Sequence, residues 1–397
     1  MATQEDVAHG SRYNAYMALT LSTIAMIVCF MSWSNFAPLA AQVATMFHLS
    51  VGQKTLLLAT PVLLGSIMRI PVGILSDKYG GKKVYIILMI FILIPLFMIT
   101  QVHTFGMLLF AALLVGMAGT SFAVGVSYAS VWFPPEKQGF ALGIVAMGNM
   151  GNAVAALTLP RISASSGFNS VYHFLMILTV IIMVLFAIFC KEMPTDKTKS
   201  VSGALSVAKE SSTWYLSLFY FLTFGLFVSF TNLTPMFLGD IFGVNAVTAG
   251  LYAALFAFLC TIIRPIGGAA ADKFRPMSML QWIFILIAVF SLVIMFSFDS
   301  QILFVTGIVG TGLAAGWGNG VVFKMVPYVS KGNTGAVTGF VGAVGGLGGF
   351  FPPLVVGWIK GWTGSYQLGI ALLVLTALIC WYVLRRRFIK GDVHIVK

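Results

Sequence analysis

Two arginines inside long apolar runs, Arg69 and Arg264, are the residues of this sequence best placed to do chemistry. Each stands eight positions before an aspartate, Asp77 or Asp272, in a segment long enough to be one helix. Eight helical residues rise roughly 12 Å, which places each guanidinium near the middle of a ~30 Å apolar layer. An arginine at that depth costs ~2.5–3.5 kcal/mol, so each must have a compensating partner or role.

The acidic residues do not provide that partner, because none falls in the middle of an apolar segment. They are Glu5, Asp6, Asp77, Glu136, Glu192, Asp196, Glu210, Asp240, Asp272, Asp299 and Asp392. We infer that a bound anion supplies the missing charge; the alternative is that each arginine caps carbonyls or faces a water-filled cleft. The arginine fork favours a planar oxyanion, and two positive charges suit a small one.

A glycine- and asparagine-rich string, GIVAMGNMGN at 143–152, could add donors to this site. Small residues four apart also favour close helix packing, which is the alternative role of its glycines. The amides of Asn149 and Asn152 are costly in lipid unless paired, and each NH2 group can donate to an anion. A later string, GFVGAVGGLGGFF, has the glycines without the asparagines, so we expect helix packing to be its main role.

The two arginines belong to an internal repeat. Arg69, Gly73 and Asp77 recur at the same spacings as Arg264, Gly268 and Asp272, at an offset of 195. GFALG at 139–143 matches GAVTG at 335–339 at an offset of 196. Two matches at nearly one offset predict duplicated halves in parallel orientation, and such halves usually bind substrate between them.

The repeated aspartates lie at helix ends, which predicts a gate. Asp77 or Asp272 could pair with a neighbouring helix end or arginine in one conformation and release it in another. We expect Gly73 and Gly268 to belong to the same gate. The alternative is that both aspartates are solvated loop charges.

Composition sets the class of protein that carries these residues. Of the 397 residues, 59% are apolar and 9% are charged, against about 25% charged in soluble domains. So few charges cannot cover a soluble globule, which excludes a cytosolic or secreted enzyme. The net charge of +12 arises between apolar runs, which is typical of membrane topology and not of nucleic-acid binding.

Apolar periodicity predicts an all-α membrane protein with twelve transmembrane helices in two six-helix halves. Each segment is long enough to cross the bilayer and too continuously apolar for a β-barrel strand. The segments are about 14–40, 52–76, 83–101, 104–132, 138–163, 171–190, 213–239, 246–271, 276–297, 301–326, 334–359 and 365–388. The polar stretch 191–212 is the predicted cytoplasmic linker between an N-terminal half, 1–190, and a C-terminal half, 213–397.

Basic residues predict the orientation. With both termini inside, 18 of the 23 Lys and Arg residues fall on the cytoplasmic side and 3 outside, and Arg69 and Arg264 remain in the membrane. This bias predicts cytoplasmic termini. The cysteines, Cys29, Cys190, Cys260 and Cys380, lie far apart in apolar runs and are expected to be buried hydrophobes. We find no nucleotide loop, metal cluster or catalytic triad, so we expect no cofactor, no metal and no enzyme activity.

The whole chain resembles the nitrate/nitrite porter family of the major facilitator superfamily. The strings that carry the resemblance are FMSWSNF at 30–36, RIP at 69–71, AGTSFA at 118–123, GNMG at 148–151, YFLTFG at 220–225, Arg264, and GAVGGLGGFF at 342–351. The glycine-rich strings together with both arginines are specific, whereas any one glycine string is weak.

The resemblance implies that Arg69 and Arg264 hold the anion. It also implies that the site is lined by Phe30, Phe122, Asn149, Tyr220 and Phe224. The positive edges of phenyl rings tolerate an anion, and their bulk excludes water. Some members carry Asn where this chain has Gly345 and Gly346, so we assign no ligand there.

We therefore expect a monomeric carrier in the bacterial cytoplasmic membrane that moves nitrate and nitrite by alternating access, with exchange favoured. Proton-coupled nitrate symport and transport of another small anion, such as an organic carboxylate, are alternatives; a carboxylate would favour a more polar cavity. A membrane sensor or scaffold would need a signalling domain, and a channel would not need paired halves with gates. Uptake of labelled nitrate and nitrite distinguishes these functional hypotheses.

Overall fold

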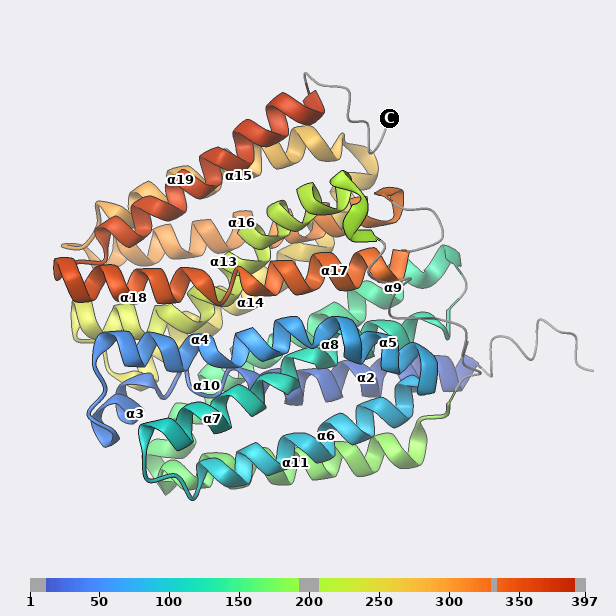
Figure 1. Ribbon diagram of the computed structural model, residues 1–397, viewed down its shortest axis with the longest axis horizontal. Helices are drawn as coiled ribbons and strands as arrows, with labels where there is room; N and C mark the ends of the chain where they lie inside the picture. Colours follow the sequence, from blue (N-terminus) through green and yellow to red (C-terminus); the bar gives the residue numbers. More distant parts are fainter. Residues whose placement is uncertain (1–11, 134, 193–206, 330–333, 390–397) are drawn as a thin grey trace, which may run out of the picture.

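The computed structural model describes residues 12–133, 135–192, 207–329 and 334–389. Every regular element in these residues is helical, and they contain no β-strand. The long helices run side by side along the longest axis of the molecule (Figure 1). The described chain is therefore all-α, as the sequence predicted.

Twelve helical pieces lie in the described residues before the linker, which belong to the N-terminal half. They are α2 (Arg12–Trp33), α3 (Ala40–Met46), α4 (Val51–Ile67), α5 (Arg69–Tyr79), α6 (Gly81–Ile99), α7 (Phe105–Val115), the 3₁₀ turn η1 (Gly116–Thr120), α8 (Ser121–Ser130), α9 (Pro135–Ala146), the 3₁₀ turn η2 (Met147–Asn149), α10 (Met150–Ser166) and α11 (Phe168–Phe189). Several predicted segments are thus made of two or three consecutive pieces.

The described elements of the C-terminal half are α13 (Ser211–Phe242), α14 (Ala246–Lys273), α15 (Pro276–Met295), α16 (Gln301–Val329), α17 (Thr334–Leu347), α18 (Phe351–Thr363), α19 (Gln367–Leu384) and the π-helical turn η4 (Arg385–Ile389). Of these, α13, α14 and α16 are the longest unbroken helices in the described residues. Most of the predicted linker lies outside the described residues. Its described end holds the 3₁₀ turn η3 (Val207–Lys209) and the start of α13.

The number of membrane-length spans agrees with the sequence. Eleven spans in the described residues are long and apolar enough to cross a membrane, and α4 with α5 forms a twelfth that is bent by 40°. Large apolar side chains such as Ile94 and Phe97 on α6, and Ile188 on α11, are exposed on the outer surface. Such a surface suits a lipid environment and would be a liability in water.

Four spans break part-way along, which the apolar pattern alone did not reveal. The second span bends at Met68, directly before Arg69, and two others pass through η1 and η2. A fourth breaks between α17 and α18, where prolines occupy the first turn of α18. Glycines and prolines weaken the helical ladder at these points, and the breaks bring site residues and main-chain carbonyls together.

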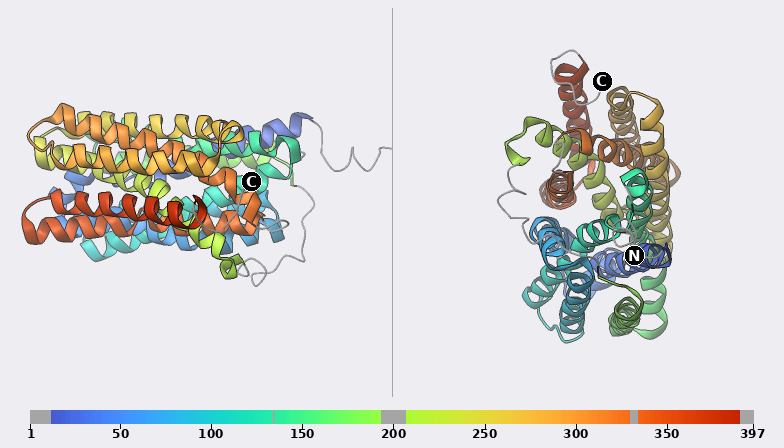
Figure 2. Two further views of the ribbon diagram at one scale, coloured as in Figure 1. Left: turned by 90° about the horizontal axis from the view of Figure 1, so that it is seen from above. Right: turned by 90° about the vertical axis from the view of Figure 1, so that its right-hand side faces the viewer.

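The two halves pack closely against each other at one end of the bundle. We call the end where α2 begins and η4 ends the terminal end, and the opposite end, which carries α3, the distal end (Figures 1 and 2). Toward the distal end α10 packs on α14 and α4 packs on α18. A Cβ at Gly250 would lie 2.4 Å from the Ala156 carbonyl oxygen, so α14 approaches α10 too closely for any side chain there.

Candidate anion site

Arg69 is buried at the bend between α4 and α5, with 1% of its surface exposed. Its Nε donates to the carbonyl oxygen of Gly119 in η1 at 3.3 Å, and its Nη1 donates to that of Gly342 in α17 at 2.9 Å. Its Nη2 is buried without a partner among the described residues. Both acceptors are uncharged carbonyls, so the positive charge of Arg69 is not neutralised.

Arg264 occupies the corresponding place in the C-terminal half, within α14, and is 7% exposed. Its Nη2 donates to the hydroxyl oxygen of Tyr220 at 3.2 Å, while its Nη1 has no partner in the described part of the chain. Across the described ranges, neither Arg69 nor Arg264 forms an ion pair. A buried donor without an acceptor is costly, and an anion could satisfy one such donor on each arginine.

Phe122, at the start of α8, lies beside both guanidiniums. Its ring centroid is 5.5 Å from the Cζ of Arg69 and 5.8 Å from the Cζ of Arg264. Cations at this distance from a ring face are attracted by its quadrupole. The shared ring brings the two arginines, 195 residues apart in sequence, to one place between the halves.

Further rings complete an aromatic wall around the guanidiniums. Phe224 lies 5.2 Å and Trp33 5.8 Å from the Cζ of Arg69, measured to the ring centroids. Tyr220 and Phe224 are one turn apart on α13, and their rings stack at 4.9 Å. This wall is apolar except for the Tyr220 hydroxyl and the Trp33 indole N–H, which donates to the Pro61 carbonyl oxygen at 3.1 Å. Charges inside it therefore interact more strongly than in water.

Two predicted site residues, Phe30 and Asn149, have no described contact with either guanidinium. Phe30 is buried and packs edge-on against Trp33 at 5.0 Å, so it supports a ring that touches Arg69. Asn149 lies in η2, buried, with an Oδ1 that has no partner among the described residues. None of the described contacts joins Asn149 to either arginine, and its donor role remains a prediction.

Gly345 and Gly346 of α17 face this site. A Cβ at Gly345 would lie 2.1 Å from the Tyr220 ring, and one at Gly346 would lie 2.2 Å from the Ser66 Oγ and 3.3 Å from the Arg69 Nη1. Side chains at these two positions would displace the ring or fill the space beside Arg69. This explains glycine here in terms of helix packing and of room for the site.

Three site neighbours were not assigned from the sequence. Phe323 on α16 has its ring centroid 4.9 Å from the Arg264 Cζ and 4.8 Å from that of Tyr220. Trp33 was noted only as part of a family string. Ser66 is buried with an unpartnered Oγ among the described residues. One Phe among 34 carries no signal of its own, and nothing in the sequence could have singled out Phe323.

The predicted gate residues lie toward the terminal end and contact their own halves. The Ser127 Oγ on α8 donates to Asp77, and Lys324 on α16 forms an ion pair with Asp272. A Cβ at Gly73 would lie 3.6 Å from the Ala123 Cβ, and one at Gly268 would lie 3.8 Å from the Gly320 carbonyl oxygen. The sequence repeat therefore corresponds to a repeated contact, α5 on α8 and α14 on α16.

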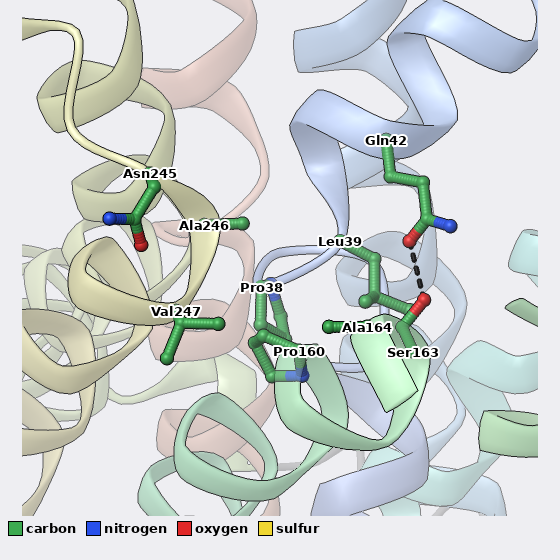
Figure 3. A pocket seen from close by; sticks show the side chains of 9 residues that line it. All are labelled: Pro38, Leu39, Gln42, Pro160, Ser163, Ala164, Asn245, Ala246 and Val247. Carbon is green, nitrogen blue, oxygen red and sulfur yellow. Dashed lines mark hydrogen bonds between the residues drawn. The ribbon is translucent and has the colours of Figure 1, made fainter. Parts of the chain in front are cut away.

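A cavity of about 350 Å³ lies away from the arginines, between the halves (Figure 3). Its lining residues are Pro38, Leu39, Gln42, Pro160, Ser163, Ala164, Asn245, Ala246 and Val247. The Ser163 Oγ donates to the Gln42 Oε1 at 2.5 Å along one wall. This lining is uncharged and suits water or a passing solute better than a fixed anion.

The described residues contain no group of three or more His, Cys, Asp or Glu side chains that could hold a metal ion. The four cysteines are buried and unpaired. The side chains that gather at the site are two guanidiniums, a phenol and a set of aromatic rings.

Comparison with known proteins places the chain in a family. The family model of the Major Facilitator Superfamily matches residues 22–327 and 216–394. The chain is 36% identical over 363 residues to the probable nitrate transporter NarT of Staphylococcus epidermidis, covering 91% of this chain and 93% of that protein. It is 35% identical over 364 residues to the nitrite extrusion protein of Bacillus subtilis, covering 91% and 92%.

Solved structures share the fold. A bacterial homologue of the human lysosomal transporter Spinster superposes with a TM-score of 0.78 at 16% identity, covering 96% of this chain and 99% of that one. The human organic anion transporter MFSD10 superposes with a TM-score of 0.72 at 15% identity, covering 93% and 99%. These likenesses confirm the predicted architecture of twelve helices in two six-helix halves. The chain belongs to the nitrate/nitrite porter family of the Major Facilitator Superfamily and is a multi-pass membrane transporter.

Proposed function

We propose that this transporter carries nitrate and nitrite across the bacterial cytoplasmic membrane by alternating access. The observation that carries the proposal is the pair of buried guanidiniums beside Phe122, each with one donor that has no partner among the described residues. Relatives named for nitrate transport and for nitrite extrusion support the same two substrates.

The chemistry of the site suits a small planar oxyanion. A guanidinium can donate two parallel hydrogen bonds to neighbouring oxygens of one anion, which an ammonium cannot do with the same geometry. Arg69, Arg264 and the Tyr220 hydroxyl provide donors, and the surrounding rings exclude water. A larger organic anion would need more polar groups than this aromatic wall offers.

The proposed moving units are the six-helix halves 1–190 and 213–397, joined by the linker 191–212. Positive residues concentrated at the terminal end favour a cytoplasmic location for both chain ends, so the distal end would face outward. The site lies between the halves, where a rocking motion could expose it to either side in turn. A single chain holds both halves and both arginines, so we propose that the monomer is the working unit.

Exchange of nitrate for nitrite is the favoured mode. Closing the halves around two unneutralised guanidiniums strips their water, and a bound anion offsets that cost. Proton symport would need a group that changes protonation during the cycle, and the sequence places no Asp, Glu or His in mid-helix. Symport through Tyr220 or an aspartate at the gate is the alternative.

Purified protein in liposomes tests the substrates. Labelled nitrate or nitrite is supplied outside, with each anion in turn loaded inside, and the expected result is uptake of both. Arg161→Lys is the matched control for arginine changes, since Arg161 is exposed on α10. Absence of uptake of either anion by correctly folded protein would overturn the proposal, and stronger competition by formate or acetate would favour a carboxylate carrier.

A further inference from the structure

We propose that Lys54, Asp240 and Tyr366 form a latch that holds the distal ends of the two halves together, and whose release is a step of the transport cycle. Lys54 lies in the first turn of α4, in the N-terminal half. Asp240, near the end of α13, and Tyr366, directly before α19, lie in the C-terminal half. The inference rests on the proposed alternating access and on no particular substrate.

The contacts of the latch are short and convergent. The Lys54 Nζ lies 2.8 Å from the Asp240 Oδ1 and 2.9 Å from its Oδ2. The Tyr366 hydroxyl donates to the same Oδ2 at 2.7 Å. The Lys54 and Asp240 side chains are 12% and 29% exposed, so this ion pair is more shielded than an ordinary surface pair, which contributes little.

Each charge of the pair stands at the helix end that disfavours it. A lysine in the first turn of α4 meets the positive end of that helix, and an aspartate in the last turn of α13 meets a negative end. A capping box between Ser50 and Gln53 fixes the start of α4, and Gly243 ends α13 in a left-handed conformation with φ 66°. Each charge is unfavourable at the end of its own helix, and the ion pair between the two side chains offsets that cost.

Tyr366 holds the aspartate from its own half. Its ring packs edge-on against Phe237 of α13 at 4.9 Å, and it is 1% exposed. Burial, and then the neighbouring Asp240 carboxylate, raise the pKa of Tyr366, so the hydroxyl stays protonated and continues to donate. Lys360, whose Nζ is 4.8 Å from the Tyr366 ring centroid, instead donates to the Gly364 carbonyl at the end of its own helix.

The two halves are closely packed beside the latch. A Cβ at Gly357 of α18 would lie 2.0 Å from the Thr55 Oγ1 of α4, one residue after Lys54. One turn below Lys54, the Asn232 Nδ2 donates to the Leu58 carbonyl at 3.5 Å, again between the halves. At the terminal end the described ion pair Asp272–Lys324 joins helices of one half. The ion pair Lys54–Asp240 joins α4 of one half to α13 of the other, so it must break when the distal ends of the halves separate.

Distance measurement between the halves tests the latch without any transport assay. Spin labels on Gly52→Cys in α4 and Gly361→Cys in α18 report the distal end, since no described atom would lie within 4 Å of a Cβ at either position. The native cysteines are buried, and parent protein without the two introduced cysteines, treated with the spin-label reagent, checks that they do not react. We expect one dominant short distance in nanodiscs for the parent, and a several-fold larger share of long distances for Lys54→Gln and Asp240→Asn.

Further variants distinguish a specific loss of the latch contacts from a nonspecific effect of mutation on the structure. Tyr366→Phe keeps the ring and should shift the distribution in the same direction by less. The double exchange Lys54→Asp with Asp240→Lys should recover the short distance at least in part. Arg161→Gln removes an exposed positive charge at the same end and should leave the distances unchanged. Unchanged distances in all three single latch variants, or equal shifts in the Arg161 control, would overturn the latch.

The outcome is independent of the proposed substrates. Failure of nitrate transport in the parent protein would reject the proposed function and leave the distance result interpretable. Conversely, normal nitrate binding with latch variants that do not shift the distances would reject the latch alone.

Discussion

Arg69 and Gly342 lie in opposite halves of the molecule, and the Arg69 Nη1 donates a 2.9 Å hydrogen bond to the Gly342 carbonyl oxygen. The same guanidinium is one of the two proposed to hold the anion. An anion that draws Arg69 toward itself competes with this contact between the halves. The Arg69 guanidinium therefore takes part both in anion binding and in the relative motion of the halves. Substrate binding can thereby change the relative free energies of the two conformations.

The first prediction concerns the geometry of the arginines. Arg69→Lys and Arg264→Lys keep the charge but lose the planar fork. Loss of one charge-assisted hydrogen bond, ~1.5–3 kcal/mol, predicts nitrate binding weaker by roughly tenfold to more than a hundredfold. Equilibrium binding to purified protein measures this. Arg161→Lys should bind like the parent, and parent-like binding by both site variants would contradict the two-pronged mode.

The second prediction concerns Tyr220, which contacts Arg264 through its hydroxyl and Phe224 through its ring. Tyr220→Phe keeps the stacking and removes the hydroxyl. One hydrogen bond of ~1 kcal/mol predicts nitrate binding about five-fold weaker. The thermal stability of the purified protein should fall only slightly, because the Arg264 Nη2 loses its acceptor. A large fall in stability with normal affinity would show that the hydroxyl is structural.

The third prediction concerns the glycines of α17. Gly345→Ala puts a methyl group 2.1 Å from the Tyr220 ring, and overpacking of this kind costs ~1–3 kcal/mol. We expect transport to fall at least several-fold because Tyr220 must move. Gly339→Ala lies on the same helix, where no described atom would come within 4 Å of the new Cβ, and should transport normally. Equal loss in both variants would point to a general effect on α17.

The apolar pattern predicted the spans because twenty apolar residues cross a bilayer whatever their neighbours are. It did not reveal the bend at Met68 or the turn η2, since hydropathy measures length and not continuity of the helical ladder. The repeat identified Arg69 and Arg264, because a charge in an apolar run is conspicuous. Neither the apolar pattern nor the repeat could identify Phe323, which depends on how α16 packs against α13 and α14. Nor could they identify the pairing of Lys54 with Asp240, which depends on how the halves meet.

The fourth prediction concerns Asp77, which accepts a hydrogen bond from Ser127. Asp77→Asn retains an acceptor oxygen and removes the charge, so the local contact can survive while any electrostatic switching is lost. Asp77 is eight residues from Arg69, roughly 12 Å of helix rise. We therefore expect slower turnover with nearly unchanged nitrate affinity. Strongly weakened equilibrium binding with normal turnover would instead assign Asp77 to the site.

The last prediction concerns coupling. Without an anion, closing the halves would leave two guanidiniums near Phe122 with neither water nor counter-charge, so the loaded carrier should change conformation faster than the unloaded one. Nitrate entry should thus be fast into liposomes that contain nitrite and slow into liposomes that contain neither anion. An inward proton gradient should change neither rate by more than its effect on the membrane potential.

Three arms of one liposome experiment decide between the coupling modes. Nitrite-loaded vesicles measure exchange, unloaded vesicles measure net entry, and unloaded vesicles with an inward proton gradient measure symport. The membrane potential is held at zero with potassium and valinomycin, so that only the chemical gradient of protons differs. Exchange predicts rapid uptake in the first arm alone, because only there does an anion accompany the return step. Rapid uptake in the third arm, tracking the size of the proton gradient, would overturn exchange and assign proton transfer to a group such as Tyr220, the hydroxyl that already contacts Arg264.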